Sequence, residues 1–244
     1  MKIKIKDKIN VTDQKIGFIG LGRIGSGMAT NLLKAGIPLI IYDLDQGSMN
    51  ELAKKGAQIA KSPAEISAEV DLVFMCLPFT PHVDNVLFSE DGIVRGAKPK
   101  LSIVDTSTIY FSDAERFQNQ LKKYEISYSD SPVSGMPFRA QNGSLTIMFG
   151  GTEKEYNSSL PYLQLMGDFI VHCGQCGTGQ MMKALNNIIY NINIAGICEV
   201  LPLALMSGLK SNVVEQVLTT ASSKSFASEY FVHRLLDRNF ESDF

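Results

Sequence analysis

The chain is poor in cysteine and carries no long block of one charge. It has four cysteines among 244 residues, and its formal net charge is −2 with a pI near 5.9. Because the body of the chain contains no basic block, nucleic acid and anionic membranes are disfavoured as its main partners. These absences favour a small molecule as the ligand.

The sequence pattern indicates neither a secretory signal nor a membrane-spanning run. Residues 1–15 contain lysines but no apolar core, so we interpret them as a flexible extension. No later run approaches transmembrane length. We therefore expect a cytoplasmic location, in which the cysteines stay reduced. Cys173 and Cys176 form one C-x-x-C pair with only His172 beside it, which disfavours a zinc site or a redox dithiol.

Residues 17–36, GFIGLGRIGSGMATNLLKAG, carry the main pattern of the chain. They predict a short strand, a G-x-G-x-x-G turn and a helix. In such a turn the first glycine permits a sharp bend, the second admits a pyrophosphate and the third lets helix and strand pack closely. The helix N-terminus offers N–H groups to the phosphate. The pattern alone is weak, but in this context it predicts a dinucleotide site at Gly20, Leu21, Gly22, Arg23, Ile24 and Gly25, with Arg23 as a cationic contact.

Asp43 ends a second apolar strand, residues 39–42, about twenty residues after the turn. A carboxylate there accepts hydrogen bonds from the adenosine ribose, which favours NAD over NADP. Asp43 could instead be a polar strand end or cap the following helix, and Asp45 competes for either role.

Strand and helix patterns alternate from residue 16 to residue 176. Further candidate strands lie at residues 71–77, 101–105, 126–130, 145–149 and 169–172, and several are apolar throughout, as strands covered on both faces should be. Helix starts carry S/T-x-x-E capping boxes at Ser48/Glu51, Ser62/Glu65, Ser112/Glu115 and Thr152/Glu155. The alternation predicts an α/β fold over residues 16–176, a Rossmann-type doubly wound, mainly parallel sheet.

Ligands of such sheets bind at the carboxyl ends of the strands, so the residues that follow each strand are candidates. Leu77 and Pro78 end the third strand and are candidates for the nicotinamide half of the cofactor, although a proline also serves simply to stop a strand. Residues 105–108 read DTST, which indicates either a functional cluster or a capped loop. Ser134 and Gly135 belong to the segment after the fifth strand.

Residues 177–244 have a different character and predict an all-helical domain. The stretch from Gly177 to Gly208 is apolar with few breakers, which indicates one long buried helix that Pro202 kinks or interrupts and Gly208 ends. Ser211 is the expected N-cap of a short helix to residue 220, and residues 226–238 predict another.

Lys183 and Asn187 are four residues apart on the long helix and therefore share one face. A lysine in this apolar setting either reaches solvent or occupies a polar cleft. Partly desolvated near a helix N-terminus, its ammonium would have a lowered pKa, which suits proton exchange with a hydroxyl. Asn187 could hold the same hydroxyl, and a surface lysine is the competing interpretation.

Four stretches occur in the order typical of one enzyme family: GFIGLGRIGSGMA, DTSTIYFSDAE, DSPVSGMPFRAQNGSLTIMFGG and GTGQMMKALNN. On these motifs the chain resembles the β-hydroxyacid dehydrogenases, which include 3-hydroxyisobutyrate dehydrogenase, tartronate semialdehyde reductase and, more distantly, 6-phosphogluconate dehydrogenase. The resemblance implies reversible oxidation of a small β-hydroxy acid to its semialdehyde or keto acid by hydride transfer to NAD(P). It also implies a homodimer or homotetramer formed through the helical domain.

The resemblance assigns roles to individual residues. Lys183 corresponds to the catalytic lysine, Asn187 to the asparagine that orients the hydroxyl, and Thr108 to a cofactor contact. Ser134 and Gly135 correspond to the residues that bind the substrate, and Met136 and Arg139 beside them are further candidates.

Two departures from the family pattern bear on these assignments. Met136 stands where the family commonly has a second glycine, so the substrate is not specified. The family also continues past residue 244, so we expect the helical domain to be incomplete. Two alternatives are a non-catalytic or impaired nucleotide-binding homologue and a 6-phosphogluconate-type decarboxylating dehydrogenase, for which Arg139 is the visible phosphate-binding candidate.

Overall fold

The computed structural model describes residues 14–241. The extension expected at residues 1–15 lies almost entirely outside this range. The chain divides into two compact units, Met1–Lys183 and Ala184–Phe244. The sequence pattern changes at residue 177, whereas the second unit begins seven residues later, at Ala184, inside a helix that belongs to both units.

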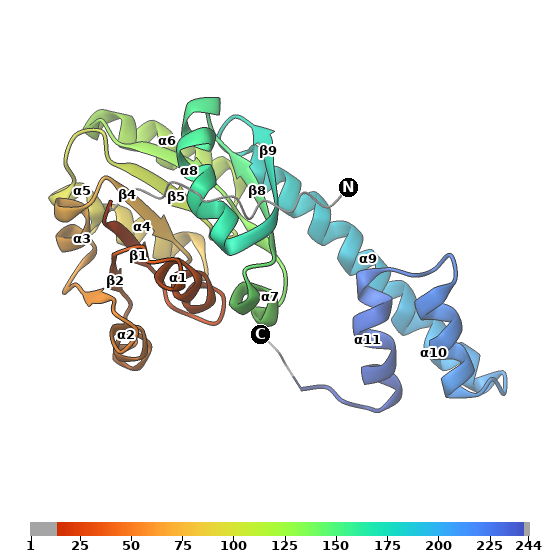
Figure 1. Ribbon diagram of the computed structural model, residues 1–244. Helices are drawn as coiled ribbons and strands as arrows, with labels where there is room; N and C mark the ends of the chain where they lie inside the picture. Colours follow the sequence, from red (N-terminus) through yellow and green to blue (C-terminus); the bar gives the residue numbers. More distant parts are fainter. Residues whose placement is uncertain (1–13, 242–244) are drawn as a thin grey trace. The chain divides into compact units, whose positions relative to one another are not determined.

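The first unit contains a sheet with helices on both faces (Figure 1). Its strands are β1 (Ile16–Ile19), β2 (Leu39–Tyr42), β3 (Gln58–Ile59), β4 (Leu72–Met75), β5 (Ser102–Asp105), β6 (Ser127–Asp130), β7 (Val133–Ser134), β8 (Leu145–Gly150) and β9 (Gly167–Gly174). Its helices are α1 (Gly25–Lys34), α2 (Gln46–Ala53), α3 (Pro63–Glu69), α4 (Thr80–Phe88), α5 (Ile93–Gly96), α6 (Phe111–Leu121), the 3-10 turn η1 (Lys122–Tyr124), α7 (Pro137–Asn142) and α8 (Glu153–Met166).

The strand order is β3-β2-β1-β4-β5-β6-β8-β7, with β9 beside β8. The strands from β3 to β6 pair in parallel, while β8 runs antiparallel to β6 and β7. The predicted doubly wound, mainly parallel sheet is therefore confirmed. Because the order reverses between β1 and β4, a crevice for a ligand is expected at the carboxyl ends of these two strands.

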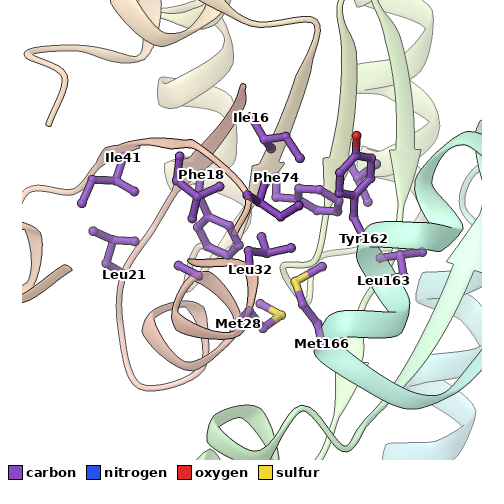
Figure 2. Close-up of a cluster of buried hydrophobic side chains, with 14 of the residues drawn as sticks. Ile16, Phe18, Leu21, Met28, Leu32, Ile41, Phe74, Tyr162, Leu163 and Met166 are labelled. Atoms are coloured by element: carbon purple, nitrogen blue, oxygen red, sulfur yellow. The ribbon is translucent and has the colours of Figure 1, made fainter. Parts of the chain in front are cut away.

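Side chains alternate between the two faces of the sheet, which gives two cores. In β4, Phe74 contributes to the core that includes α1, α2 and α8, whereas Val73 and Met75 contribute to the core that includes α3, α4, α5 and α6. Figure 2 shows the first core, where Met28 of α1 and Met166 of α8 lie close to the strand side chains. Apolar burial on both faces fixes the strand register.

Two of the four predicted capping boxes mark helix starts in the structure. Thr152 and Glu155 form a reciprocal capping box on α8. Ser62 caps α3 through the N–H of Glu65, and the Glu65 carboxylate accepts from the N–H of Lys61 rather than from Ser62.

The other two capping predictions are wrong. Ser48 lies inside α2, because the side chain of Asp45 accepts from the N–H groups of Gly47 and Ser48 and starts the helix earlier. Ser112 lies inside α6, which begins at Phe111. Two short strands, β3 and β7, were missed because two residues carry too little periodicity to be recognised.

The second unit consists of the C-terminal part of α9 (Thr178–Met206) with α10 (Ser211–Thr220) and α11 (Phe226–Leu236). Ile197 and Leu201 of α9 pack with Val214 of α10 and Val232 of α11. Ser211 is not the N-cap of α10, because Lys210 holds that position. Pro202 lies within α9 and does not end it.

Helix α9 is not the buried helix that its sequence suggests. Of its most apolar 18-residue window, 11% is buried, and the exposed side chains include Ile188, Ile189, Ile192 and Leu203. Its length and composition would also allow it to cross a membrane, so the expectation that no run approaches that length is wrong. A long interdomain helix with one apolar face can have the same length and composition.

Candidate active site

The three glycines of the turn after β1 differ in what surrounds them. Gly20 has a φ of +94°, and a methyl group there would overlap the carbonyl oxygen of Cys76 in the loop after β4. A methyl group at Gly25 would overlap the carbonyl oxygen of Gly20. A methyl group at Gly22, in contrast, meets no atom of the described residues within 4 Å. Gly20 and Gly25 therefore permit tight packing, and Gly22 leaves an open approach to the backbone.

The remaining residues of the turn form the edge of this opening. The side chain of Leu21 is buried in the first core, so its contribution to the site is through its backbone. Arg23 is exposed. Ile24 precedes α1 and has no side-chain oxygen with which to cap it. A helix start of this kind can direct its N–H groups at an anion.

Asp43 is linked directly to the turn. One carboxylate oxygen accepts from the N–H of Leu21, and the other accepts from the N–H of Asp45 at 2.8 Å. Asp45 is the cap of α2, and its hydrogen bonds from Ser48 and Gly47 lower its pKa. The structure thus assigns the helix cap to Asp45. Asp43 lies half-buried beside the glycine turn.

The loops after β4 and β5 are joined by one network. The N–H of Leu77 donates to Ser107 Oγ at 2.8 Å, and the N–H of Ser107 donates to Asp105 Oδ1 at 2.9 Å. Tyr128 Oη donates to Asp105 Oδ2 at 2.7 Å, and burial raises the pKa of Asp105. Asp105 and Ser107 therefore form a capped loop, which presents the exposed Thr108.

Pro78 is also exposed at the carboxyl edge of the sheet. It follows Leu77 directly and precedes α4, so it lies outside strand pairing. This position is compatible both with a cofactor contact and with a proline that only stops the strand.

The segment between β7 and α7 brings the candidate substrate residues together. Ser134 is half-buried and pairs with Thr146 of β8. Gly135 has a φ of +142°, and a methyl group there would lie 3.2 Å from Cδ of Arg139. The Arg139 side chain therefore folds back against Gly135. Met136 is 4% exposed and precedes the first turn of α7.

Lys183 lies in the second turn of α9 and is half-buried. Burial lowers the pKa of its ammonium group, as expected for a desolvated cation. Asn187 follows one turn later on the same helix and is also half-buried.

Asp130 and Gln180 are buried polar residues that were not among the predicted site residues. Asp130 ends β6 and accepts from the N–H groups of Gly177 and Gln180 at the start of α9. Burial raises the pKa of Asp130 to about 6, although these two N–H groups oppose the shift. Asp130 at the end of a predicted strand and Gln180 in the GTGQ segment could both be recognised in the sequence. No local pattern indicated that the two residues contact each other, because they are 50 residues apart.

Family models match both parts of the chain. Residues 15–177 match the NAD binding domain of 6-phosphogluconate dehydrogenase. Residues 177–244 match a domain described as NAD-binding of NADP-dependent 3-hydroxyisobutyrate dehydrogenase. The second match includes α9.

Curated relatives are hydroxyacid dehydrogenases by name. The chain is 38% identical to "Probable 3-hydroxyisobutyrate dehydrogenase, mitochondrial" of Dictyostelium discoideum, over 90% of this chain and 68% of the relative. It is 34% identical to the 2-(hydroxymethyl)glutarate dehydrogenase of Eubacterium barkeri, over 88% of this chain and 71% of the relative. The chain thus spans about two thirds of the length of the curated relatives that it matches.

A solved structure named Psf3, in complex with NADP+ and 2-OPP, has the same fold. It superposes with a TM-score of 0.85 at 25% identity, over 94% of this chain and 81% of that one.

Proposed function

Because the chain belongs to the β-hydroxyacid dehydrogenase family, a family of NAD(P)-dependent oxidoreductases, we propose that it interconverts a small β-hydroxy acid and its semialdehyde or keto acid. The observation that carries this proposal is the unobstructed backbone at Gly22, which lies at the same edge of the sheet as the Thr108 loop and the start of the lysine-bearing helix. The bound nicotinamide would supply the hydride chemistry, while the chain supplies binding, orientation and proton transfer.

The residues of the turn fit a dinucleotide. The space at Gly22 would receive the pyrophosphate beside the first turn of α1, and the exposed Arg23 would add a positive charge. Leu77, Pro78 and Thr108 would border the nicotinamide half. No described atom lies within 4 Å of a methyl group placed at Gly22, so the backbone there is free to be approached by a phosphate.

We further propose that NAD is preferred over NADP. Asp43 supports this, because its carboxylate lies beside the turn and would repel a ribose 2′-phosphate while it accepts from a 2′-hydroxyl. NADP is named in the description of one matching domain and is bound in the Psf3 complex. These statements apply to the matching domain and to Psf3, and the preference proposed for this chain rests on Asp43.

Lys183 is proposed as the general acid and base. Its Nζ would take the proton from the substrate hydroxyl during oxidation and return it during reduction. The lowered pKa supports this role, since it brings the ammonium closer to the pH at which both protonation states occur. Asn187, one turn along the same helix, would hold the substrate hydroxyl through its side-chain amide.

The substrate carboxylate would be held by the Ser134 hydroxyl, the Gly135 N–H and the Arg139 guanidinium. The proximity of the Arg139 side chain to Gly135 supports this grouping, because guanidinium and N–H donors suit a carboxylate. Met136 would limit which acid is accepted, since it is larger than the glycine common at this position in the family.

We also propose that the chain associates with itself through the exposed apolar side chains of α9. Ile188, Ile189 and Ile192 are each more than half exposed, and soluble monomers rarely expose contiguous apolar patches beyond roughly 300–600 Å². We also propose a cytoplasmic location for the chain.

A substrate screen tests the proposed reaction. The purified chain is offered 3-hydroxyisobutyrate, 2-(hydroxymethyl)glutarate, glycerate and 6-phosphogluconate, and reduction of NAD or NADP is followed by absorbance. We expect turnover of at least one of the three small acids and none of 6-phosphogluconate. Tight dinucleotide binding without turnover of any compound would instead favour a non-catalytic homologue.

A variant tests the role of Lys183. Lys183→Ala should lower turnover by about 10²–10⁴-fold, as expected for loss of a general acid and base, while the dinucleotide dissociation constant changes little. Lys123→Ala, which removes an exposed lysine from η1, is the matched control and should behave as wild type. Normal turnover by Lys183→Ala would show that the lysine is not the proton-transfer group.

A further inference from the structure

The start of α9 is held by a carboxylate from a distant strand. Asp130 Oδ1 accepts from the N–H of Gly177 at 2.6 Å, and Asp130 Oδ2 accepts from the N–H of Gln180 at 2.7 Å. Asp130 is fully buried at the end of β6. Its carboxylate therefore acts as the N-cap of α9, although Asp130 lies about fifty residues before that helix in the chain.

The backbone packs closely around this carboxylate. A methyl group at Gly179 would lie 2.7 Å from Asp130 Oδ2, and one at Gly150 would overlap Oδ1. Both glycines are thus needed for the carboxylate to reach the helix. The first turn of α9 therefore lies directly against the end of β6.

The side chain of Gln180 forms a second connection, to the loop after β5. Its Nε2 donates to the carbonyl oxygen of Ser107 at 2.8 Å, and its Oε1 accepts from the N–H of Ile109 at 3.1 Å. These two partners flank Thr108. Gln180 is 1% exposed, so both hydrogen bonds form in a dry environment, where an unmade hydrogen bond is costly.

Lys183 follows Gln180 by three residues on the same helix, and residues at this spacing are neighbours on the helix surface. A shift of the first turn would therefore move Lys183 by a similar amount. Reacting groups must stay within a fraction of an ångström of their productive geometry, and a displacement of about 1 Å can cost about 10²-fold in rate.

We infer that Gln180 and Asp130 are positioning residues that hold Lys183 in register with the loops that carry Thr108 and Leu77. This inference rests on the proposed role of Lys183. The same Ser107 whose carbonyl accepts from Gln180 also accepts from the N–H of Leu77 through its hydroxyl. One network thus connects the lysine-bearing helix to the two loops proposed to border the nicotinamide.

The principal test replaces Gln180 by methionine, which has similar length and volume but neither hydrogen bond. Gln180→Met should lower kcat by about 10- to 100-fold and leave the KM for the dinucleotide within about threefold. Gln175→Met makes the same exchange at an exposed position before α9 and should leave kcat unchanged. If Gln180→Met fails to fold, Gln180→Glu retains the size of the side chain and the acceptor for Ile109, and the same loss of kcat is expected.

A second readout does not depend on turnover. Competitive acetylation of Lys183, followed by mass spectrometry, reports the reactivity of its amine in each variant. We expect the reactivity of Lys183 in Gln180→Met and in Asp130→Asn to differ from wild type, and Gln175→Met to match wild type. The two substitutions combined should cost less than the product of their separate effects on kcat, because both act on one turn of helix.

The outcomes separate the inference from the proposed reaction. Wild-type kcat and wild-type Lys183 reactivity in folded Gln180→Met would overturn the positioning role. If the wild type turns over no substrate while the reactivity of Lys183 in Gln180→Met still differs from wild type, the positioning role is supported and the proposed reaction is refuted. A loss of stability with unchanged kcat would show that Gln180 has a structural role only, and would likewise overturn the inference.

Discussion

The unobstructed backbone at Gly22 leads to a prediction in which Gly22 and Gly25, two glycines of the same turn, behave differently. Gly22 lacks a left-handed φ, and a methyl group there meets no described atom within 4 Å. Gly25 is buried, and a methyl group there overlaps the carbonyl oxygen of Gly20. Gly22→Ala should therefore weaken cofactor binding without unfolding the chain, whereas Gly25→Ala should destabilise the fold itself.

The magnitudes follow from what each methyl group meets. At Gly22 the backbone accommodates alanine, so the free energy of unfolding should stay the same or rise by about 0.4–1 kcal/mol. A bound pyrophosphate would be displaced by the methyl group at a cost of about 1–3 kcal/mol, which corresponds to roughly 5- to 150-fold weaker binding. At Gly25 the obstacle is a backbone oxygen that cannot rotate away, so about 1–3 kcal/mol or more of unfolding free energy should be lost.

Urea denaturation measures the stability of each variant, and isothermal titration with NAD and NADP measures the dissociation constants. Gly196→Ala is the control, because its methyl group in α9 also meets no described atom within 4 Å and it should leave cofactor binding unchanged. If Gly22→Ala binds both dinucleotides as tightly as wild type, the turn is not the pyrophosphate site. Unchanged stability of Gly25→Ala would refute the packing argument.

Three further predictions concern the cofactor, the buried carboxylate and the apolar helix. Asp43→Asn should shift the ratio of NADP to NAD affinity toward NADP by about tenfold or more, because a negative charge that repels the 2′-phosphate is removed; calorimetric affinities of the wild type that are equal for both cofactors would contradict the premise. The pKa of Asp130 is raised to about 6 in the folded chain from 3.8, so the folded state binds this proton more tightly and the free energy of unfolding should fall by on the order of 3 kcal/mol as pH rises from about 4 to about 6. That decline should be absent in Asp130→Asn when urea unfolding is measured at several pH values, and identical pH profiles would refute the assignment. Ile192→Glu, at a side chain that is 60% exposed, should shift the chain toward monomer in sedimentation velocity, and a wild type that is already monomeric at high concentration would exclude association through this face.

Much of the Rossmann-type unit could be predicted because its signals are local. The apolar run of β1, the glycine turn and α1 lie within about twenty residues, and each glycine has a backbone reason that any chain with this turn would share. Thr152 and Glu155 likewise form a capping box within four residues. Patterns of this kind are independent of what the rest of the chain does.

Local patterns were insufficient where several candidates compete for one role. Ser48 and Ser112 have capping-box spacing, but Asp45 starts α2 and α6 begins at Phe111. Which residue becomes the N-cap depends on where the preceding strand ends, and the sequence pattern does not predict that position. The apolar sequence of α9 similarly indicated burial, although burial depends on what packs against a helix, and Ile188 and Ile192 are exposed.

The arrangement around Lys183 lies beyond the reach of local patterns. The motifs indicated Lys183, Thr108 and Leu77 separately, each at the end of its own element. The connections between them run from Asp130 to Gly177 and from Gln180 to Ser107, across 47 and 73 residues respectively. Such pairs form because parallel strands bring their carboxyl ends to one edge of the sheet, where buried polar groups must find partners. Composition and periodicity are properties of neighbours along the chain, whereas the partner of a buried polar group depends on which strands become neighbours in space.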